Sequence, residues 1–125
     1  MDKKQFQDRT KKLAVRVIKM TETLPHTRAA DIIAKQIIRS CTSTAANYRA
    51  ACRPKSVPDM IHKLNIVAEE ADETLFWLEL LIETDLIPQA KLQNLLQETD
   101  EILAMTITSL KTLRHRQSQI PNPKS

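Results

Sequence analysis

Glycine is absent from this chain of 125 residues. Loops that cradle phosphates and turns that bind dinucleotides depend on glycine for backbone freedom and close approach to the ligand. The sequence therefore excludes nucleotide-binding enzymes built on those motifs. Aromatic residues are also scarce, at 3%, so the core has to consist of leucine, isoleucine, valine and alanine. No stretch alternates apolar and polar residues with period two, so we expect no sheet.

Long apolar runs are missing as well. The longest, LFWLELLI, is interrupted by Glu79 and is far shorter than the roughly 18 residues that span a membrane, so no membrane partner is expected. The start, MDKKQFQDRTKK, has no apolar segment typical of a secretory signal. Cys41 and Cys52 are the only cysteines, and on one helix they would stand about 16 Å apart, too far for a disulfide. Two unpaired thiols indicate a cytoplasmic protein.

The net charge of +4 hides a segregation of charge along the chain. Residues 1–64 carry 14 Lys and Arg against 5 Asp and Glu, whereas residues 65–110 carry Lys91 alone against 10 acids. Residues 111–125 add four basic residues. The two halves of the chain are therefore expected to attract each other.

Apolar residues at helical spacing predict four helices. The first runs from about Lys3 to Leu24 before Pro25, and the second from Thr27 to Cys52 before Arg53-Pro54. The third is capped at Ser56 and ends at a break around 84–85, and the fourth begins near residue 88 and carries apolar residues through 113. Long helices joined by short connections predict an all-α, antiparallel up-down four-helix bundle. It would form one domain, residues 1–115, followed by a flexible polar tail, residues 116–125.

The third predicted helix has a core stripe and a second apolar group outside it. The predicted stripe consists of Val57, Met60, Ile61, Leu64, Ala68, Ala71, Leu75, Leu78 and Ile82. Outside the stripe lie Ile66, Phe76, Trp77, Leu80 and Leu81, with the acids Glu70 and Glu73 among them. An apolar patch of this kind on a monomer is typical of an interface, and tryptophan is a favoured anchor. The candidates for an oligomer interface are therefore Ile66, Glu70, Glu73, Trp77, Leu80 and Leu81. The alternative is that the helix ends and the 84–88 connection cover this patch within one chain.

The second predicted helix has a small-polar flank and a basic face beside its apolar stripe. Ser40, Ser43 and Asn47, with Gln36, lie on the flank, where small residues allow two helices to pack closely. A catalytic serine is rejected, because no histidine lies at helical spacing and no glycine-supported elbow exists. The basic face consists of Arg28, Lys35, Arg39, Arg49 and Arg53, which Lys55 extends into the next connection.

Metal and cofactor sites are not expected. Di-iron bundles need Glu-x-x-His on two helices, whereas none of the three histidines here, His26, His62 and His115, has a glutamate three residues before it. The acids near residue 70 lie beside or behind the core stripe, where solvent or basic side chains would neutralise them.

An ordered series of polar positions runs through QIIRS at 36–40, ANYRAA at 46–51, HKLNIV at 62–67, EEADETL at 69–75 and WLELL at 77–81. This series resembles the four-helix-bundle proteins of the 23S ribosomal RNA intervening-sequence type. The resemblance implies up-down bundles that assemble into ring-shaped homopentamers, with no assigned reaction. A more distant resemblance is to the accessory variability determinants of diversity-generating retroelements, which implies contact with nucleic acid and a reverse transcriptase. The chain differs at Ala50 and Ala51, where such proteins often carry an acid and a nearby glycine.

Two functions follow from these patterns. The basic face could bind RNA or DNA phosphates, with contacts multiplied around a ring. It could equally be neutralised by the acidic half of the chain, which would leave a protein-binding adaptor that makes no contact with nucleic acid. In both cases the protein is expected to be non-enzymatic and homo-oligomeric.

Overall fold

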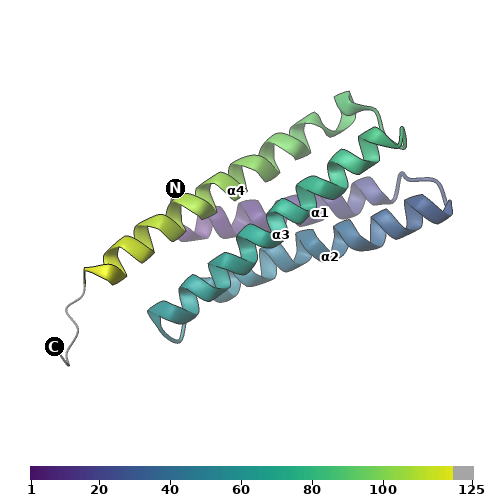
Figure 1. Cartoon of the computed structure of the whole chain (residues 1–125). Helices are drawn as coiled ribbons and strands as arrows, with labels where there is room; N and C mark the ends of the chain where they lie inside the picture. Colours follow the sequence, from purple (N-terminus) through teal and green to yellow (C-terminus); the bar gives the residue numbers. More distant parts are fainter. Residues whose placement is uncertain (120–125) are drawn as a thin grey trace.

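The computed structural model describes residues 1–119, which form four helices joined by short connections. These are α1 (Lys3–Thr21), α2 (Arg28–Ala51), α3 (Val57–Glu83) and α4 (Gln89–Ser118). The helices lie side by side and alternate in direction (Figure 1), which confirms the predicted antiparallel four-helix bundle. The predicted tail lies mostly outside the described residues, and the domain boundary at residue 115 stays a prediction.

Side-chain caps fix where the helices begin. At α1 the Asp2 carboxylate accepts a bond from the Gln5 backbone N–H (2.8 Å) while the Gln5 side chain accepts one from the Asp2 N–H (3.1 Å), a complete capping box. Thr27 caps α2. At α3 the Ser56 hydroxyl accepts from the Asp59 N–H (3.1 Å), so the predicted start is confirmed.

The helix ends follow from local hydrogen bonds. The regular part of α1 ends at Thr21 rather than at Leu24, because the approach to Pro25 breaks the last turn. The end of α3 is a Schellman motif in which the Leu86 N–H bonds the Leu81 carbonyl (3.0 Å). Its left-handed position, usually glycine, is taken here by Asp85 with φ 58°, since a short polar side chain tolerates that conformation.

The core is a heptad seam on every helix rather than a purely apolar stripe. On α3 the buried positions are Leu64, Val67, Ala71, Thr74, Leu78 and Leu81, spaced alternately by three and four. The predicted stripe was therefore wrong in part: Ala68, Leu75 and Ile82 are only half-buried and Val57 is exposed. Threonines fill seam positions on the other helices as well, and their hydroxyls bond the preceding turn, as in Thr99 to the Leu95 carbonyl (2.7 Å).

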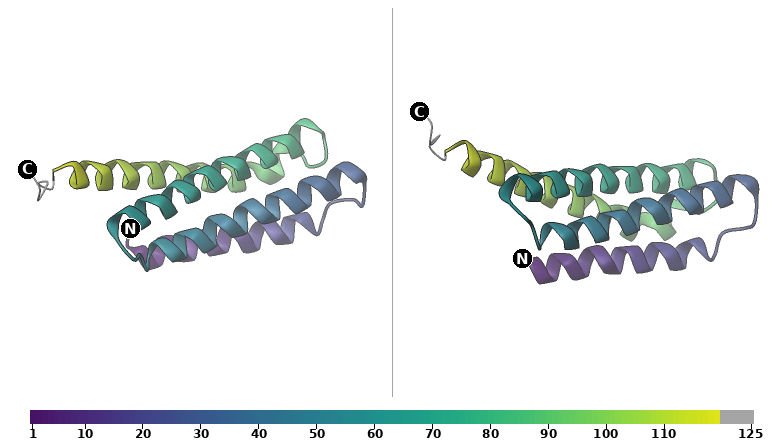
Figure 2. Two further views of the ribbon diagram at one scale, coloured as in Figure 1. Left: turned by 60° about the horizontal axis from the view of Figure 1, so that its bottom comes forward. Right: turned by 90° about the horizontal axis from the view of Figure 1, so that it is seen from below.

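The bundle is not equally closed on all sides. α2 packs against α1 and α3, and α3 packs against α4, whereas α1 and α4 contact each other over a much shorter stretch. Arg9 of α1 bridges this side by donating to Glu98 (2.9 Å) and Glu101 (3.0 Å) of α4. The last turns of α4 continue past the start of α1 and project beyond that end of the bundle (Figures 1 and 2).

The cysteines agree with the expectation within the described residues. Cys41 is buried, Cys52 is half-buried, and both are free thiols as predicted. Across residues 1–119 no helix is both long and apolar enough to cross a membrane.

Candidate nucleic-acid interface

The outer face of α2 carries most of the predicted basic side chains in a solvent-exposed position. Arg28 and Lys35 lie near its start, Arg49 near its end, and Arg53 and Lys55 in the connection that follows. All five are exposed, and within residues 1–119 none of them forms an ion pair. The five cations are therefore available to an anionic partner.

Arg39, the sixth predicted cation, forms ion pairs within the subunit. Its guanidinium donates to Glu70 of α3 (Nη1–Oε2, 3.0 Å) and forms a second ion pair with Glu73. The Arg39 side chain remains 47% exposed, so the pairing takes place at the protein surface. The basic face is thus divided into an early group, Arg28 and Lys35, and a late group at residues 49–55.

The late group extends onto α1. A shallow hollow of about 270 Å³ between α1 and α2 is lined by Lys11 and Arg49 together with Gln7, Thr42 and small alanines. Two cations from different helices at one hollow suit a phosphate better than a single surface charge does, because the helix backbones hold their separation.

The predicted small-polar flank has two different environments. Ser40 is fully buried, and its hydroxyl lies 2.8 Å from that of Thr74 across the α2–α3 contact. Ser43 and Asn47 are half-buried, and the Asn47 amide donates to the Ser43 carbonyl (2.9 Å) within α2. Ser40 thus lies at the helix contact, while Ser43 and Asn47 lie partly exposed outside it.

The predicted oligomer-interface residues need one correction. Leu81 is fully buried in the core, because it continues the heptad of Thr74 and Leu78. Ile66 and Leu80 are half-buried on the α2 side of α3. Glu70 and Glu73 are engaged with Arg39.

Trp77 is also largely covered within the subunit. It packs against the core, and its buried indole nitrogen has no hydrogen-bond partner within residues 1–119. The residue that projects from α3 is its neighbour Phe76, which is 52% exposed and stands edge-on to Trp77 at 4.9 Å between ring centres. The sequence also places Phe76 outside the core stripe, and its exposure agrees with that.

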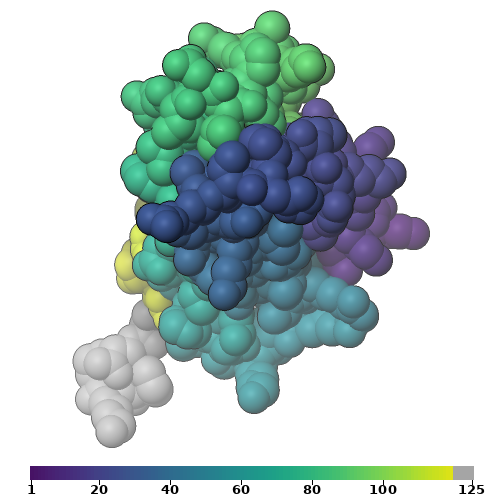
Figure 3. Space-filling view, turned by 90° about the vertical axis from the view of Figure 1, so that its right-hand side faces the viewer, coloured from purple at the N-terminus to yellow at the C-terminus, as the bar shows by residue number. Residues whose placement is uncertain are grey.

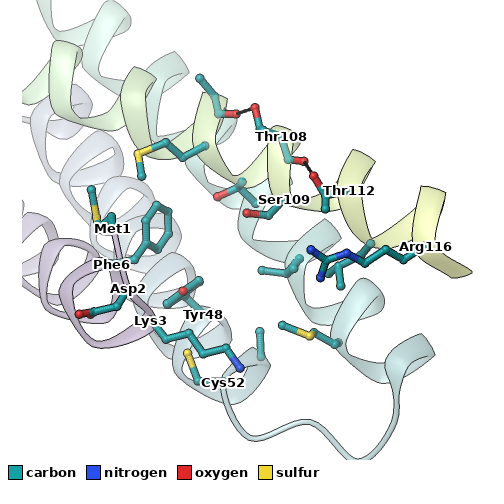
Figure 4. Close-up of a pocket in the computed structure, with 17 residues that line it drawn as sticks. Met1, Asp2, Lys3, Phe6, Tyr48, Cys52, Thr108, Ser109, Thr112 and Arg116 are labelled. Carbon is teal, nitrogen blue, oxygen red and sulfur yellow. Dashed lines mark hydrogen bonds between the residues drawn. The ribbon is translucent and has the colours of Figure 1, made fainter.

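A larger hollow of about 530 Å³ lies at the end of the bundle where α1 begins and α4 ends (Figure 4). Its apolar walls come from α1, α2, α3 and α4 and include Phe6, Leu64 and Leu113. Polar groups from Lys3, Tyr48, Cys52 and Arg116 also line it, with Arg116 extending from α4 over the hollow. Such a hollow suits an apolar group with a polar end. No sequence signal marked it, since it is built from the ends of four helices.

The titratable groups near the core do not form a reactive set. Burial raises the pKa of the Cys41 thiol to about 12, so the nucleophilic thiolate is suppressed. Burial, followed by the neighbouring Cys52, also raises the pKa of Tyr48. Among residues 1–119 no three His, Cys, Asp or Glu side chains gather closely enough to hold a metal ion.

Comparison with known proteins places the chain among bundles of the same kind. The family model for the 23S rRNA-intervening sequence protein matches residues 2–108. A crystal structure from Bacteroides thetaiotaomicron, a protein of unknown function from the S23 ribosomal protein family, superposes with a TM-score of 0.82. The two sequences are 36% identical over 89% of this chain and 99% of that one. No curated protein matches the sequence.

Proposed function

This chain belongs to the 23S rRNA-intervening sequence protein family, and from that premise we propose that it is a non-enzymatic, self-associating bundle that binds RNA through α2. The observation that supports RNA binding is the row of exposed cations along α2 and the connection after it, which form no ion pair within residues 1–119. The family name refers to an RNA and indicates no reaction. The two free thiols support a reducing compartment, the cytoplasm, as the site of action.

The binding would rest on phosphate contacts rather than on base recognition. No aromatic residue lies among the exposed cations of α2, so stacking platforms for bases are missing from this face. Arg and Lys contacts to phosphates release counterions, and each contact on a single strand adds a slope of about −0.7 to the salt dependence of affinity. Between 1 M and 0.1 M salt, each contact therefore raises the affinity about fivefold.

Self-association, with five subunits as in the family it resembles, would multiply this weak contact. Large apolar side chains on the outer faces of the bundle support association: Val15, Ile32, Phe76 and Ile107 are each at least 40% exposed. Several linked copies of one weak phosphate site bind a long RNA far more tightly than one copy does.

The proposal is tested by fluorescence anisotropy with a labelled single-stranded RNA at 0.05 M salt. Arg49→Glu combined with Arg53→Glu should lower the affinity at least 25-fold, because two contacts at about fivefold each are lost and repulsion is added. Lys91→Glu combined with Lys111→Glu makes the same change in net charge at exposed positions on α4 and should have a much smaller effect. Equal losses in both variants, or no binding by the wild type, would remove the RNA-binding proposal.

The hollow at the end of the bundle favours a second candidate, a protein adaptor. An open, mostly apolar hollow with cations at its edge can accept an apolar side chain from a partner such as a reverse transcriptase. Nuclease treatment separates the two functions: a partner retained after digestion, and lost in Leu113→Glu, supports the adaptor.

A further inference from the structure

We propose that copies of this chain join head to tail, with the start of α2 on one copy docked against the outer strip of α3 on the next. The inference rests on the proposed self-association and names the two surfaces that would carry it. The occupant of each surface is a second copy of this chain, and the argument comes from matched charge and matched spacing.

The first surface, called here the basic patch, is centred on Ile32. This side chain is 55% exposed. Arg28 lies four residues before it and Lys35 three residues after it, so all three project from one side of α2. Both cations are exposed and form no ion pair within residues 1–119.

The second surface, called here the acidic strip, is centred on Phe76, which is 52% exposed. Asp72 lies four residues before it and Glu79 three residues after it, the same spacing as in the basic patch. Glu69 and Glu83, seven residues to either side, continue the strip. All four acids are exposed and unpaired in the part of the chain that the structure describes.

The two surfaces therefore complement each other in charge and in spacing. When the helices dock antiparallel, Arg28 meets Glu79 and Lys35 meets Asp72 while Ile32 packs against the Phe76 ring. Exposed ion pairs add little to affinity, so the aromatic contact has to supply the anchor and the charges the choice of partner. Neither surface complements itself, which excludes a symmetric two-fold dimer through either one.

The placement of the surfaces favours a closed ring. α2 and α3 are neighbours in the bundle, and outward directions on neighbouring helices of four differ by about 90°, which closes a head-to-tail series after roughly four or five copies. Both surfaces also lie toward the same end, since Ile32 precedes Ser40 and Phe76 follows Thr74, which face each other at 2.8 Å. Their centres differ in height by only about 9 Å at 1.5 Å per residue, an offset that a tilt of the docked helices absorbs.

This assembly divides the cations of α2 into two uses. The early group joins copies, while the late group, Arg49, Arg53 and Lys55, stays exposed at the far half of α2 and in the following connection. Figure 3 views the end that holds the α1–α2 and α3–α4 connections, and the start of α2 lies open at its surface, as docking requires.

Charge exchange tests the proposal by light scattering after size exclusion. Arg28→Glu with Lys35→Glu, and separately Asp72→Lys with Glu79→Lys, should each reduce the assembly to single subunits while circular dichroism shows an intact fold. All four substitutions in one chain restore complementarity in the opposite sense and should recover the wild-type mass. A four-site variant that stays monomeric but folded, or single-surface variants that keep the wild-type mass, would overturn the interface.

The same measurement separates this interface from the proposed function. A wild type that is monomeric at every concentration removes self-association altogether. A wild-type oligomer that is indifferent to these charges retains self-association and shows that its interface lies elsewhere. The Arg49→Glu, Arg53→Glu variant should keep the wild-type mass, because neither residue belongs to either surface.

Discussion

The ion pairs between Arg39 and α3 withhold one cation from the α2 face, and releasing it should strengthen RNA binding. Glu70→Gln combined with Glu73→Gln removes both partners of the Arg39 guanidinium while keeping the size of the side chains. Arg39 is already 47% exposed, so its side chain can turn outward without a change in the backbone. A freed arginine adds about one phosphate contact, which raises affinity about fivefold at 0.1 M salt.

The cost in stability should be small. Both pairs lie at the surface, where each contributes about 0.2–1 kcal/mol, so the double variant should unfold about 1 kcal/mol more easily. For a chain of this size that lowers Tm by roughly 3–5 °C. The buried hydrogen bond between Ser40 and Thr74 beneath the pair remains and holds the α2–α3 contact.

The assay is anisotropy with single-stranded RNA across a series of salt concentrations, at a constant assembly mass verified by light scattering. The slope of log affinity against log salt should become steeper by about 0.7 for each engaged subunit. A control, Asp85→Asn with Asp100→Asn, makes the same change in net charge at exposed sites away from Arg39. An equal gain in the control, or no gain in the double variant, would refute a contact by the released arginine.

Three further predictions concern the core and the titratable groups. Leu81→Ala should destabilise the fold by about 2–5 kcal/mol in urea unfolding, because it removes a fully buried side chain from the α3 seam. The hydrogen bond from Arg9 lowers the pKa of Glu98. The wild type should therefore be about 1 kcal/mol more stable than Glu98→Gln at every pH above the ordinary glutamate pKa. This difference in stability should disappear as the pH falls through the lowered pKa, which unfolding curves at neutral and acidic pH will show. Cys52 should react with a thiol reagent at pH 8 while Cys41 stays unmodified until the protein unfolds, because burial raises its pKa to about 12.

The four helices and their starts could be predicted because prolines, caps and apolar periodicity are local signals. The register of α3 was harder, since Thr74 occupies a core position with a polar side chain. Treating it as a surface residue moved the stripe toward Leu75 and left Leu81 outside the core. A threonine that satisfies its hydroxyl on the Glu70 carbonyl (2.9 Å) can fill a seam position, but composition alone does not reveal that bond.

The candidate site was predictable in composition but not in pairing. Helical spacing placed the cations of α2 on one face, and all of them lie at the surface. Arg39 pairs with α3, whereas Arg49 does not. This difference depends on the level along the bundle at which α2 and α3 contact each other. The hollow lined by Phe6 and Arg116 depends on how far α4 extends beyond α1, which no single segment encodes.

The most direct test of whether α2 binds phosphates is the salt dependence of RNA binding, measured for the wild type and for the Arg49→Glu, Arg53→Glu variant. The wild type should show a steep, linear fall of log affinity with log salt, and the variant a slope shallower by about 1.4 for each engaged subunit at an unchanged assembly mass. Equal slopes for the two proteins would show that these arginines contact no phosphate and would contradict the account.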